Sequence, residues 1–203
     1  GRQQELYDEM ENELLVEISE GITSTAPIIL TKYLRLQQIS SGIITDVDGN
    51  QLNIVEPAHN PRISDLVNII ENEVTNKVIV VCRFRLSIEN IKKVLISRGY
   101  KVAVMHGSIG NDPANGLDAQ KRLFTDGDCD ILLAQLQVLN FGHTLCGPDE
   151  NPCLDMIHFE CNFSLIDRAQ CESRPEKVER DKAISHWDMY ASKMDKVIIE
   201  ALI

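Results

Sequence analysis

Cysteine and histidine side chains gather between residues 143 and 171, where their chemistry could serve a metal ion. The set comprises Cys146, Cys153, Cys161, Cys171, His143 and His158. Zinc modules use short ligand pairs such as Cys-x-x-Cys, and the sequence contains no such pair. Cysteine is also common as a small buried hydrophobic residue. We therefore expect free thiols in a reducing compartment and no structural metal ion.

The familiar motifs for phosphate binding and hydrolysis are missing from the sequence. No Gly-x-x-x-x-Gly-Lys-Ser/Thr loop is present to cradle phosphates, and no Gly-x-Gly-x-x-Gly fingerprint follows an apolar run. Gly-x-Ser-x-Gly and His-Glu-x-x-His are absent as well. Taken alone, the chain lacks the groups with which proteins usually hold and hydrolyse a nucleotide.

Composition limits the partners of this chain. It has 203 residues, 43% of them hydrophobic, which is enough to bury a core. Its 31 acidic and 20 basic residues give a net charge of −11, so any contact with nucleic-acid phosphates must use a local basic patch. No apolar run approaches the roughly 20 residues of a membrane helix, and Gly1 is not followed by a signal core. The start without Met suggests a fragment of a longer protein.

Helical and strand patterns alternate along most of the chain. Apolar spacing predicts helices at residues 3–20, 27–42, 63–74, 87–99, 117–124, 164–171 and 185–202. Apolar runs predict strands at residues 77–82, 101–105, 130–134 and 155–159. Residues 45–50 read as a turn, and 51–61 as a loop or small hairpin. Trp187 and Tyr190 are expected to anchor the last helix to the sheet.

These patterns predict an α/β fold with a doubly wound parallel sheet, because continuous apolar strands suit a sheet covered on both faces. Residues 1–60 form N-terminal helices and a connecting loop that pack on the lobe, and residues 61–203 form the lobe itself. The acidic first helix is interpreted as a solvated face.

The order of short segments resembles the second RecA-like lobe of Swi/Snf-type superfamily-two helicases, which are double-stranded DNA translocases. The resemblance runs over nearly the whole chain, and its opening helix has the form of phage and bacterial members. The segments are residues 33–42, 59–66, 77–84 (motif IV), 105–108, 131–145 (motif V), 170–174 (motif VI) and 194–198. It implies a protein of the bacterial or phage-infected cytoplasm.

The resemblance implies a site for ATP between two lobes. The first lobe, elsewhere in the same polypeptide, would hold the phosphates and Mg²⁺, so this chain alone is expected to bind neither tightly and to be inactive. Arg174 takes the place of the arginine finger, which stabilises charge on the transferred phosphoryl group. Lys177 takes the place of a second arginine, and Gln170 and Gly142 are the expected nucleotide contacts. The alternative interpretation is that Arg174 has no catalytic role and is a surface side chain paired with a nearby glutamate.

Two departures from the family pattern put ATPase coupling in doubt. After Arg174 the family has a second arginine and a glycine-glutamine, where this chain has Lys177, Glu179 and Arg180. A lysine keeps the charge but not the planar fork of arginine. In motif V, bulky Val138 and Leu139 replace small residues that would allow close backbone approach.

Contacts to double-stranded DNA are expected at backbone phosphates, because a translocase must slide regardless of sequence. The candidates follow apolar strands, where ligands approach an open α/β sheet. They are Arg83, Arg85, His106, Gly107, Ser108 and Gln137. The two arginines read equally well as part of a solvated loop, and His106 as a structural histidine.

Two other functions remain open on the sequence. A lobe with altered motifs V and VI could have lost its chemistry and serve as a protein-interaction scaffold. An unrelated small-molecule enzyme on a similar sheet is the third reading, but it explains none of the ordered motif matches.

Overall fold

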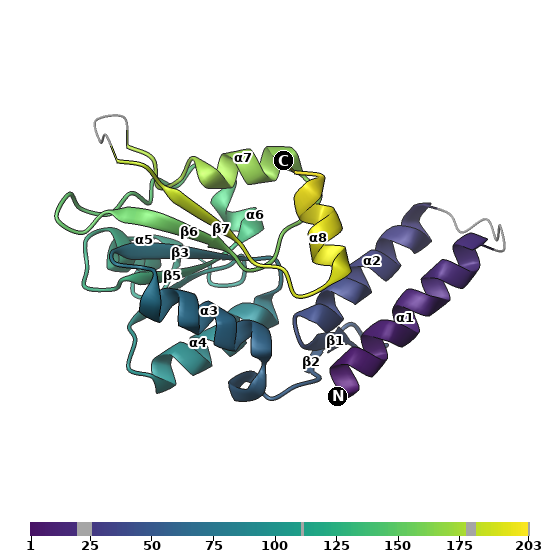
Figure 1. Cartoon of the computed structure of the whole chain (residues 1–203). Coiled ribbons are helices and arrows are strands. Elements are labelled where there is room, and N and C mark those ends of the chain that lie inside the picture. Colours follow the sequence, from purple (N-terminus) through teal and green to yellow (C-terminus); the bar gives the residue numbers. More distant parts are fainter. Residues whose placement is uncertain (20–25, 111, 178–181, 203) are drawn as a thin grey trace.

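A five-stranded parallel sheet forms the centre of the molecule (Figure 1). The computed structural model describes residues 1–19, 26–110, 112–177 and 182–202. The strand order is β4-β5-β3-β6-β7. The strands are β3 (Lys77–Cys82), β4 (Val102–Met105), β5 (Ile131–Gln135), β6 (Cys153–His158) and β7 (Ser185–Asp188). All four neighbouring pairs are parallel, which confirms the predicted fold class.

Helices cover both faces of the sheet, so the central strands are buried on both sides. One face packs against α3 (Pro61–Asn72) and α4 (Arg85–Ser97). The other packs against α5 (Leu117–Thr125), α6 (Leu136–Leu139) and α7 (Leu165–Glu172). Successive side chains of β3 alternate between these two layers, because a strand points its side chains to opposite faces. This explains why the whole strand is apolar after Lys77.

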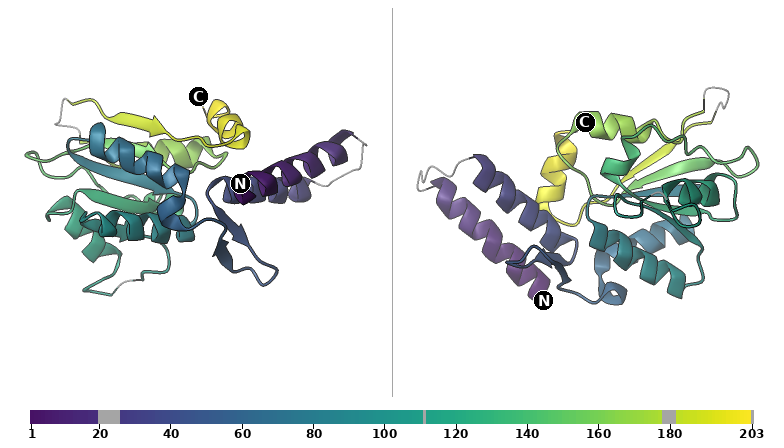
Figure 2. Two further views of the ribbon diagram at one scale, coloured as in Figure 1. Left: turned by 60° about the horizontal axis from the view of Figure 1, so that its bottom comes forward. Right: turned by 180° about the vertical axis from the view of Figure 1, so that it is seen from behind.

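The N-terminal region forms a helical pair beside the sheet (Figure 2). Helices α1 (Arg2–Ser19) and α2 (Ala26–Ser40) pack side by side, and a third apolar cluster joins them to α8 (Lys193–Glu200). The predicted end of the first helix, Gly21, lies outside the described residues. A hairpin of β1 (Ile43–Thr45) and β2 (Gln51–Asn53) follows, so the predicted turn at 45–50 is confirmed. A short 3-10 turn, η1 (Pro57–His59), then leads into the lobe.

The prediction of one continuous helix over residues 185–202 is wrong. Residues 185–188 form the edge strand β7, which pairs with β6, and the helix α8 begins only after its N-cap, Ser192. Trp187 belongs to the strand and donates a hydrogen bond to Asp155 Oδ1 at 3.0 Å. Tyr190 is 67% exposed, so it does not anchor a helix. Pairing with a neighbouring strand has overridden the local helical spacing.

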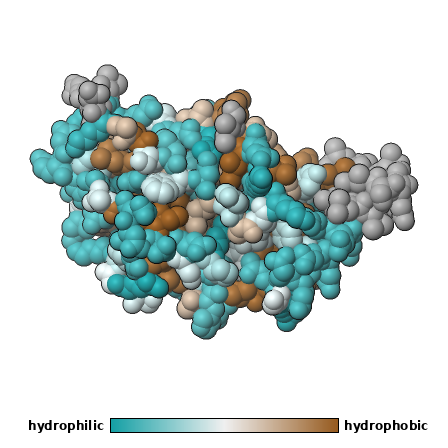
Figure 3. Space-filling model, in the orientation of Figure 1, coloured by the Kyte–Doolittle hydropathy of each residue, from teal (hydrophilic) through white to brown (hydrophobic). Residues whose placement is uncertain are grey.

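The surface is mostly hydrophilic with scattered apolar patches (Figure 3). Among the described residues, no helix has both the length and the apolarity needed to cross a membrane.

Candidate nucleotide and nucleic-acid contacts

Arg174 lies just beyond helix α7, in the turn that follows the C-cap residue Ser173. The hydroxyl of Ser164 caps the start of this helix. The Arg174 amide donates to the carbonyl of Cys171 at 3.0 Å, and the Leu145 amide donates to the carbonyl of Arg174 at 2.9 Å. The structure therefore brings together the segments that resemble motifs V and VI.

The side chain of Arg174 is half-buried and incompletely satisfied. Its Nε has no hydrogen-bond partner in the described part of the chain. In that same part, no ion pair joins it to Glu172 or Glu176, since Glu172 instead accepts from Arg168 Nε at 2.5 Å. Burial lowers the pKa of His143, and the positive charge of Arg174 lowers it further. Nε itself is buried, so an external acceptor such as a phosphate oxygen would meet the terminal nitrogens of the guanidinium, which have no ion-pair partner among the described residues.

The other expected nucleotide contacts lie near Arg174 in sequence but differ in their surroundings. Gln170 is exposed on α7, which ends before Arg174, so the two do not share one helical face. Lys177 Nζ forms an ion pair with Asp149 at 2.9 Å, so its charge is already partly neutralised. Gly142 is exposed with φ +77°, a backbone conformation that favours glycine. Glu179 and Arg180 lie outside the described residues.

All candidate DNA contacts except Gln137 follow β3 or β4 at the carboxyl edge of the sheet. Three of them, Arg83, Arg85 and Ser108, border a groove with the β1–β2 turn. Arg85 Nη1 donates to Ser108 Oγ at 3.2 Å, and that hydroxyl lies 2.9 Å from His106 Nδ1. The Gly107 amide contacts Gln135 Oε1 at 3.4 Å. Burial, and then the charge of Arg85, lowers the pKa of His106. The neutral form of this histidine is therefore favoured.

The two arginines after β3 have different environments. Arg83 Nη1 donates to Gln37 Oε1 at 2.6 Å, and burial lowers the pKa of Arg83. Arg85 is exposed and pairs only weakly with Glu89, at 3.3 Å on the same helix. Arg85 is therefore the side chain free to reach a phosphate, whereas Arg83 links the N-terminal helices to the sheet.

Gln137, the remaining DNA candidate, lies apart from this groove on the short helix α6. It is exposed, while its neighbours Val138 and Leu139 are buried against the sheet. The bulky residues of motif V therefore close the packing at this point.

The buried residue Glu160 holds the loop on one side of the groove in place, and the sequence analysis did not identify it. Its fully buried carboxylate accepts hydrogen bonds from the amides of Arg83 and Phe84 at 2.9 and 3.0 Å. The hydroxyl of Ser87 donates to it at 2.6 Å. A carboxylate at this place caps the N-terminus of α4 and fixes the loop that carries Arg83 and Arg85. An acidic residue directly after an apolar strand was the available signal.

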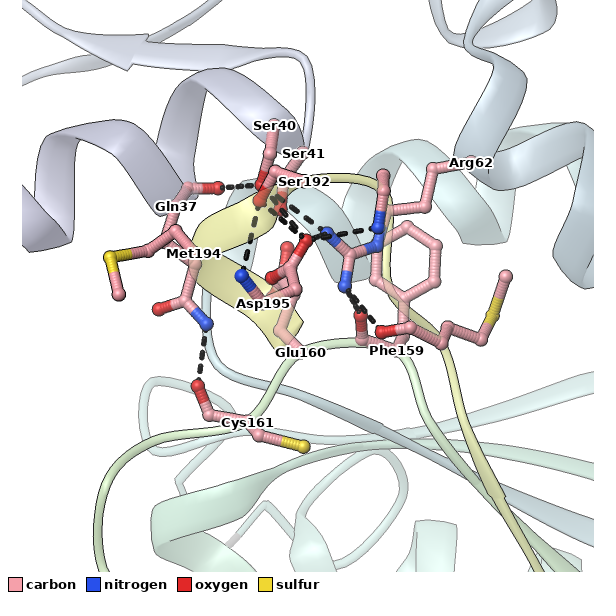
Figure 4. Close-up of polar contacts among 12 residues, drawn as sticks. Gln37, Ser40, Ser41, Arg62, Phe159, Glu160, Cys161, Ser192, Met194 and Asp195 are labelled. Atoms are coloured by element: carbon pink, nitrogen blue, oxygen red, sulfur yellow. Dashed lines mark hydrogen bonds and ion pairs between the residues drawn. The ribbon is translucent and has the colours of Figure 1, made fainter. Parts of the chain in front are cut away.

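A buried ion pair joins two segments of the family resemblance (Figure 4). Arg62 Nη1 contacts Asp195 Oδ2 at 2.9 Å, with both side chains at most 3% exposed. Arg62 also donates to the carbonyls of Phe159 and Met189, and the hydroxyl of Ser192 donates to Asp195 at 3.0 Å. The pair fastens α3 and the sheet to α8.

Solved structures provide the comparison with known proteins. The Sulfolobus solfataricus SWI2/SNF2 ATPase core domain has a TM-score of 0.69 at 14% identity, over 99% of this chain and 40% of that chain. The C-terminal domain of the same ATPase gives 0.67 at 16% identity, over 99% and 79%. The C-terminal part of the Fun30 ATPase domain gives 0.60 at 19% identity, over 75% and 48%. The chain has the RecA-like fold of these C-terminal ATPase lobes.

The C-terminal domain of the DEAD-box protein Dbp5 has the same fold, with a TM-score of 0.57 at 13% identity over 70% of this chain and 76% of that one. No protein-family model and no curated protein sequence matches the chain. This RecA-like lobe spans less than half the length of the Fun30 and SWI2/SNF2 core structures. The expected fold is therefore confirmed, while the roles of individual residues stay predictions.

Proposed function

We propose that this RecA-like lobe is the second motor lobe of an ATP-dependent double-stranded DNA translocase of the Swi/Snf type. ATP and Mg²⁺ are held by a first lobe of the same polypeptide, and this lobe supplies Arg174 and the contacts to the DNA backbone. The observation that carries the proposal is the place of Arg174 beside the motif V segment, with a guanidinium that has no ion-pair partner among the described residues. The alternative is a lobe without chemistry that serves as a scaffold.

The guanidinium of Arg174 suits charge that develops during phosphoryl transfer. It stays protonated, and its planar fork matches two phosphate oxygens at once. Because lobe closure brings it to the phosphate, its contact is stronger in the transition state than in the ground state. Phe141 in the motif V segment is 80% exposed, and Leu165 and Ile166 on α7 are 60% and 70% exposed. These apolar side chains suit a surface that meets another lobe.

The DNA contacts of the proposal lie at the groove beside the β1–β2 turn. Arg85 and Ser108 offer a cation and a hydroxyl, and the amide of Gly107 adds a neutral donor. None of these groups reads a base, which suits movement along any sequence. Because the chain carries a net charge of −11, binding by this lobe alone is expected to be weak and salt-sensitive.

The decisive experiment replaces Arg174 in the complete two-lobe protein. In Arg174→Ala, kcat of the DNA-stimulated ATPase should fall by at least about 10²-fold, with a much smaller change in ATP affinity. Arg174→Lys should recover only part of the rate, because lysine lacks the fork. The melting temperature should change little, since the half-buried Arg174 side chain forms no ion pair within the described residues that its loss would break.

Arg98→Ala is the control, because Arg98 is an exposed arginine at the C-terminal end of α4 that pairs with Glu71 at the C-terminal end of α3. It should change neither rate nor melting temperature. An unchanged rate in Arg174→Ala would favour the scaffold. A parallel collapse of the melting temperature would assign Arg174 to folding instead of catalysis.

A further inference from the structure

Three potential metal ligands converge beneath α7, away from the groove described above. His158 ends β6, His186 lies in the neighbouring strand β7, and Glu172 ends α7. Glu172 Oε1 lies 3.6 Å from His158 Nε2 and 3.8 Å from His186 Nδ1. The three ligand atoms lie within 4.8 Å of one another. Within the described residues, this is the one group of three or more such side chains close enough to share an ion.

The buried histidine is unsatisfied as it stands. His158 is 2% exposed, and its Nε2 has no hydrogen-bond partner among the described residues, since 3.6 Å is too long for one. An unpaired polar atom in this position costs free energy that a ligand would recover.

The charges around the site favour a cation. Arg168 binds Asp188 through two hydrogen bonds of 2.6 and 3.0 Å, so these opposite charges largely cancel. Arg168 Nε also donates to Glu172 Oε1 at 2.5 Å, so the one guanidinium is shared between two carboxylates and the three side chains together carry one net negative charge. This hydrogen bond orients the Glu172 carboxylate, and a bound ion shares Oε1 with it.

We propose that His158, Glu172 and His186 bind one Zn²⁺ ion. Zinc bonds of about 2.0–2.1 Å place tetrahedral ligand atoms about 3.4 Å apart. The two contacts with Glu172 therefore need to shorten by a few tenths of an ångström, and the two histidine nitrogens, which lie within 4.8 Å of each other, by up to about 1.4 Å. Two imidazoles select a borderline transition-metal ion over Mg²⁺ or Ca²⁺, which prefer oxygen ligands. His186 is 29% exposed, and water from that side completes the fourth position.

The ion would tie α7 to two strands of the sheet. Glu172 precedes Arg174 by two residues, so the bound ion also steadies the turn after α7. Zinc binding does not depend on the ATPase proposal, because it can be measured on this chain without nucleotide or DNA.

The test is zinc binding by the untagged 203-residue chain after metal removal, followed by equilibrium dialysis and thermal unfolding. We expect one Zn²⁺ per chain and a rise in melting temperature. His186→Ala and Glu172→Gln should weaken binding at least tenfold and abolish the rise. His59→Ala removes an exposed histidine outside the cluster and should leave binding unchanged.

His158→Ala can fail to fold because the residue is buried, so His186→Ala, checked by circular dichroism, is the decisive variant. Co²⁺ used in place of Zn²⁺ should give tetrahedral visible bands without a sulfur charge-transfer band, because no cysteine is in the set. Unchanged binding in His186→Ala, or a thiolate band, would overturn the proposal. A chain that binds no Zn²⁺ would overturn it as well.

Discussion

Two arginines separated by one residue differ in what surrounds them, and that difference decides which of them is expected to contact DNA. Arg83 is hydrogen-bonded to Gln37, whereas Arg85 is exposed at the start of α4. We expect Arg85→Ala to weaken binding of a labelled DNA duplex at low salt. The slope of log Kd against log salt concentration should fall by about the amount that corresponds to one lost phosphate contact. Fluorescence titration at several salt concentrations provides the measurement.

Arg83→Ala is the comparison variant for that titration. It should lower the melting temperature, because it removes a partly buried hydrogen bond between the N-terminal helices and the sheet. Equal losses of DNA binding in both variants, with no change in stability, would show that the assignment of Arg85 is wrong.

The buried pair of Arg62 and Asp195 gives a prediction about stability. Asp195→Asn leaves the Arg62 charge buried without a counter-ion, and such changes cost about 3–5 kcal/mol. Urea unfolding of the variant should therefore show a midpoint far below that of the parent chain. Glu71→Gln, which breaks an exposed pair with Arg98, should cost less than about 1 kcal/mol. Similar costs for the two variants would contradict the interpretation.

Sequence reasoning could not assign these buried roles. Arg62 and Asp195 are 133 residues apart, and nothing in the local pattern of either segment identifies the other as its partner. Arg174 was found only through the family resemblance, since its lack of a glutamate partner is a property of the folded chain. Lys177 was expected to be available, but its ion pair with Asp149 depends on a loop 28 residues away.

At the scale of elements, the apolar pattern was sufficient where packing is uniform. The strand at residues 77–82 was predicted with its correct ends, because both of its faces are buried. Residues 185–188 were assigned to a helix, because a short edge strand with one polar face has no distinctive pattern. The helix α6 was not predicted, because four residues are too few to show a helical spacing of apolar side chains.

The junction between α2 and α3 depends on Gly42. Its φ is +80°, and a Cβ there would lie 2.5 Å from Asn60 Nδ2, which itself donates to the Ser41 carbonyl at 2.9 Å. Gly42→Ala therefore places an alanine in a strained left-handed backbone conformation, and it also disturbs Asn60, the N-cap of α3. We expect a loss of at least about 2 kcal/mol in unfolding free energy, measured by urea titration.

Gly99→Ala is a matched control for this change. Gly99 has nearly the same backbone angle, φ +89°, but no atom within 4 Å of the added Cβ. It should lose only the backbone contribution, about 1–2 kcal/mol. Equal losses at Gly42 and Gly99 would show that the contact with Asn60 is unimportant.

At the scale of the whole molecule, the chain has the fold of one lobe and lacks the phosphate-binding loop of a nucleotide hydrolase. The purified 203-residue chain should therefore show no steady-state ATPase activity, with or without duplex DNA. Phosphate release measured with a coupled assay checks this. Turnover that Arg174→Ala abolishes would mean that the chain carries a complete catalytic site.

The ion pair between α3 and α8 also constrains how the protein is made. A ribosome delivers Arg62 before Asp195, so the nascent chain holds this cation without its counter-ion until the 133 residues up to Asp195 have been made. Until α8 emerges, burial of Arg62 carries the desolvation cost of an unpaired charge, and the apolar surface between α2 and the sheet stays exposed to water. Chaperones that bind exposed apolar segments can therefore act on this surface until α8 has left the ribosome and covers it.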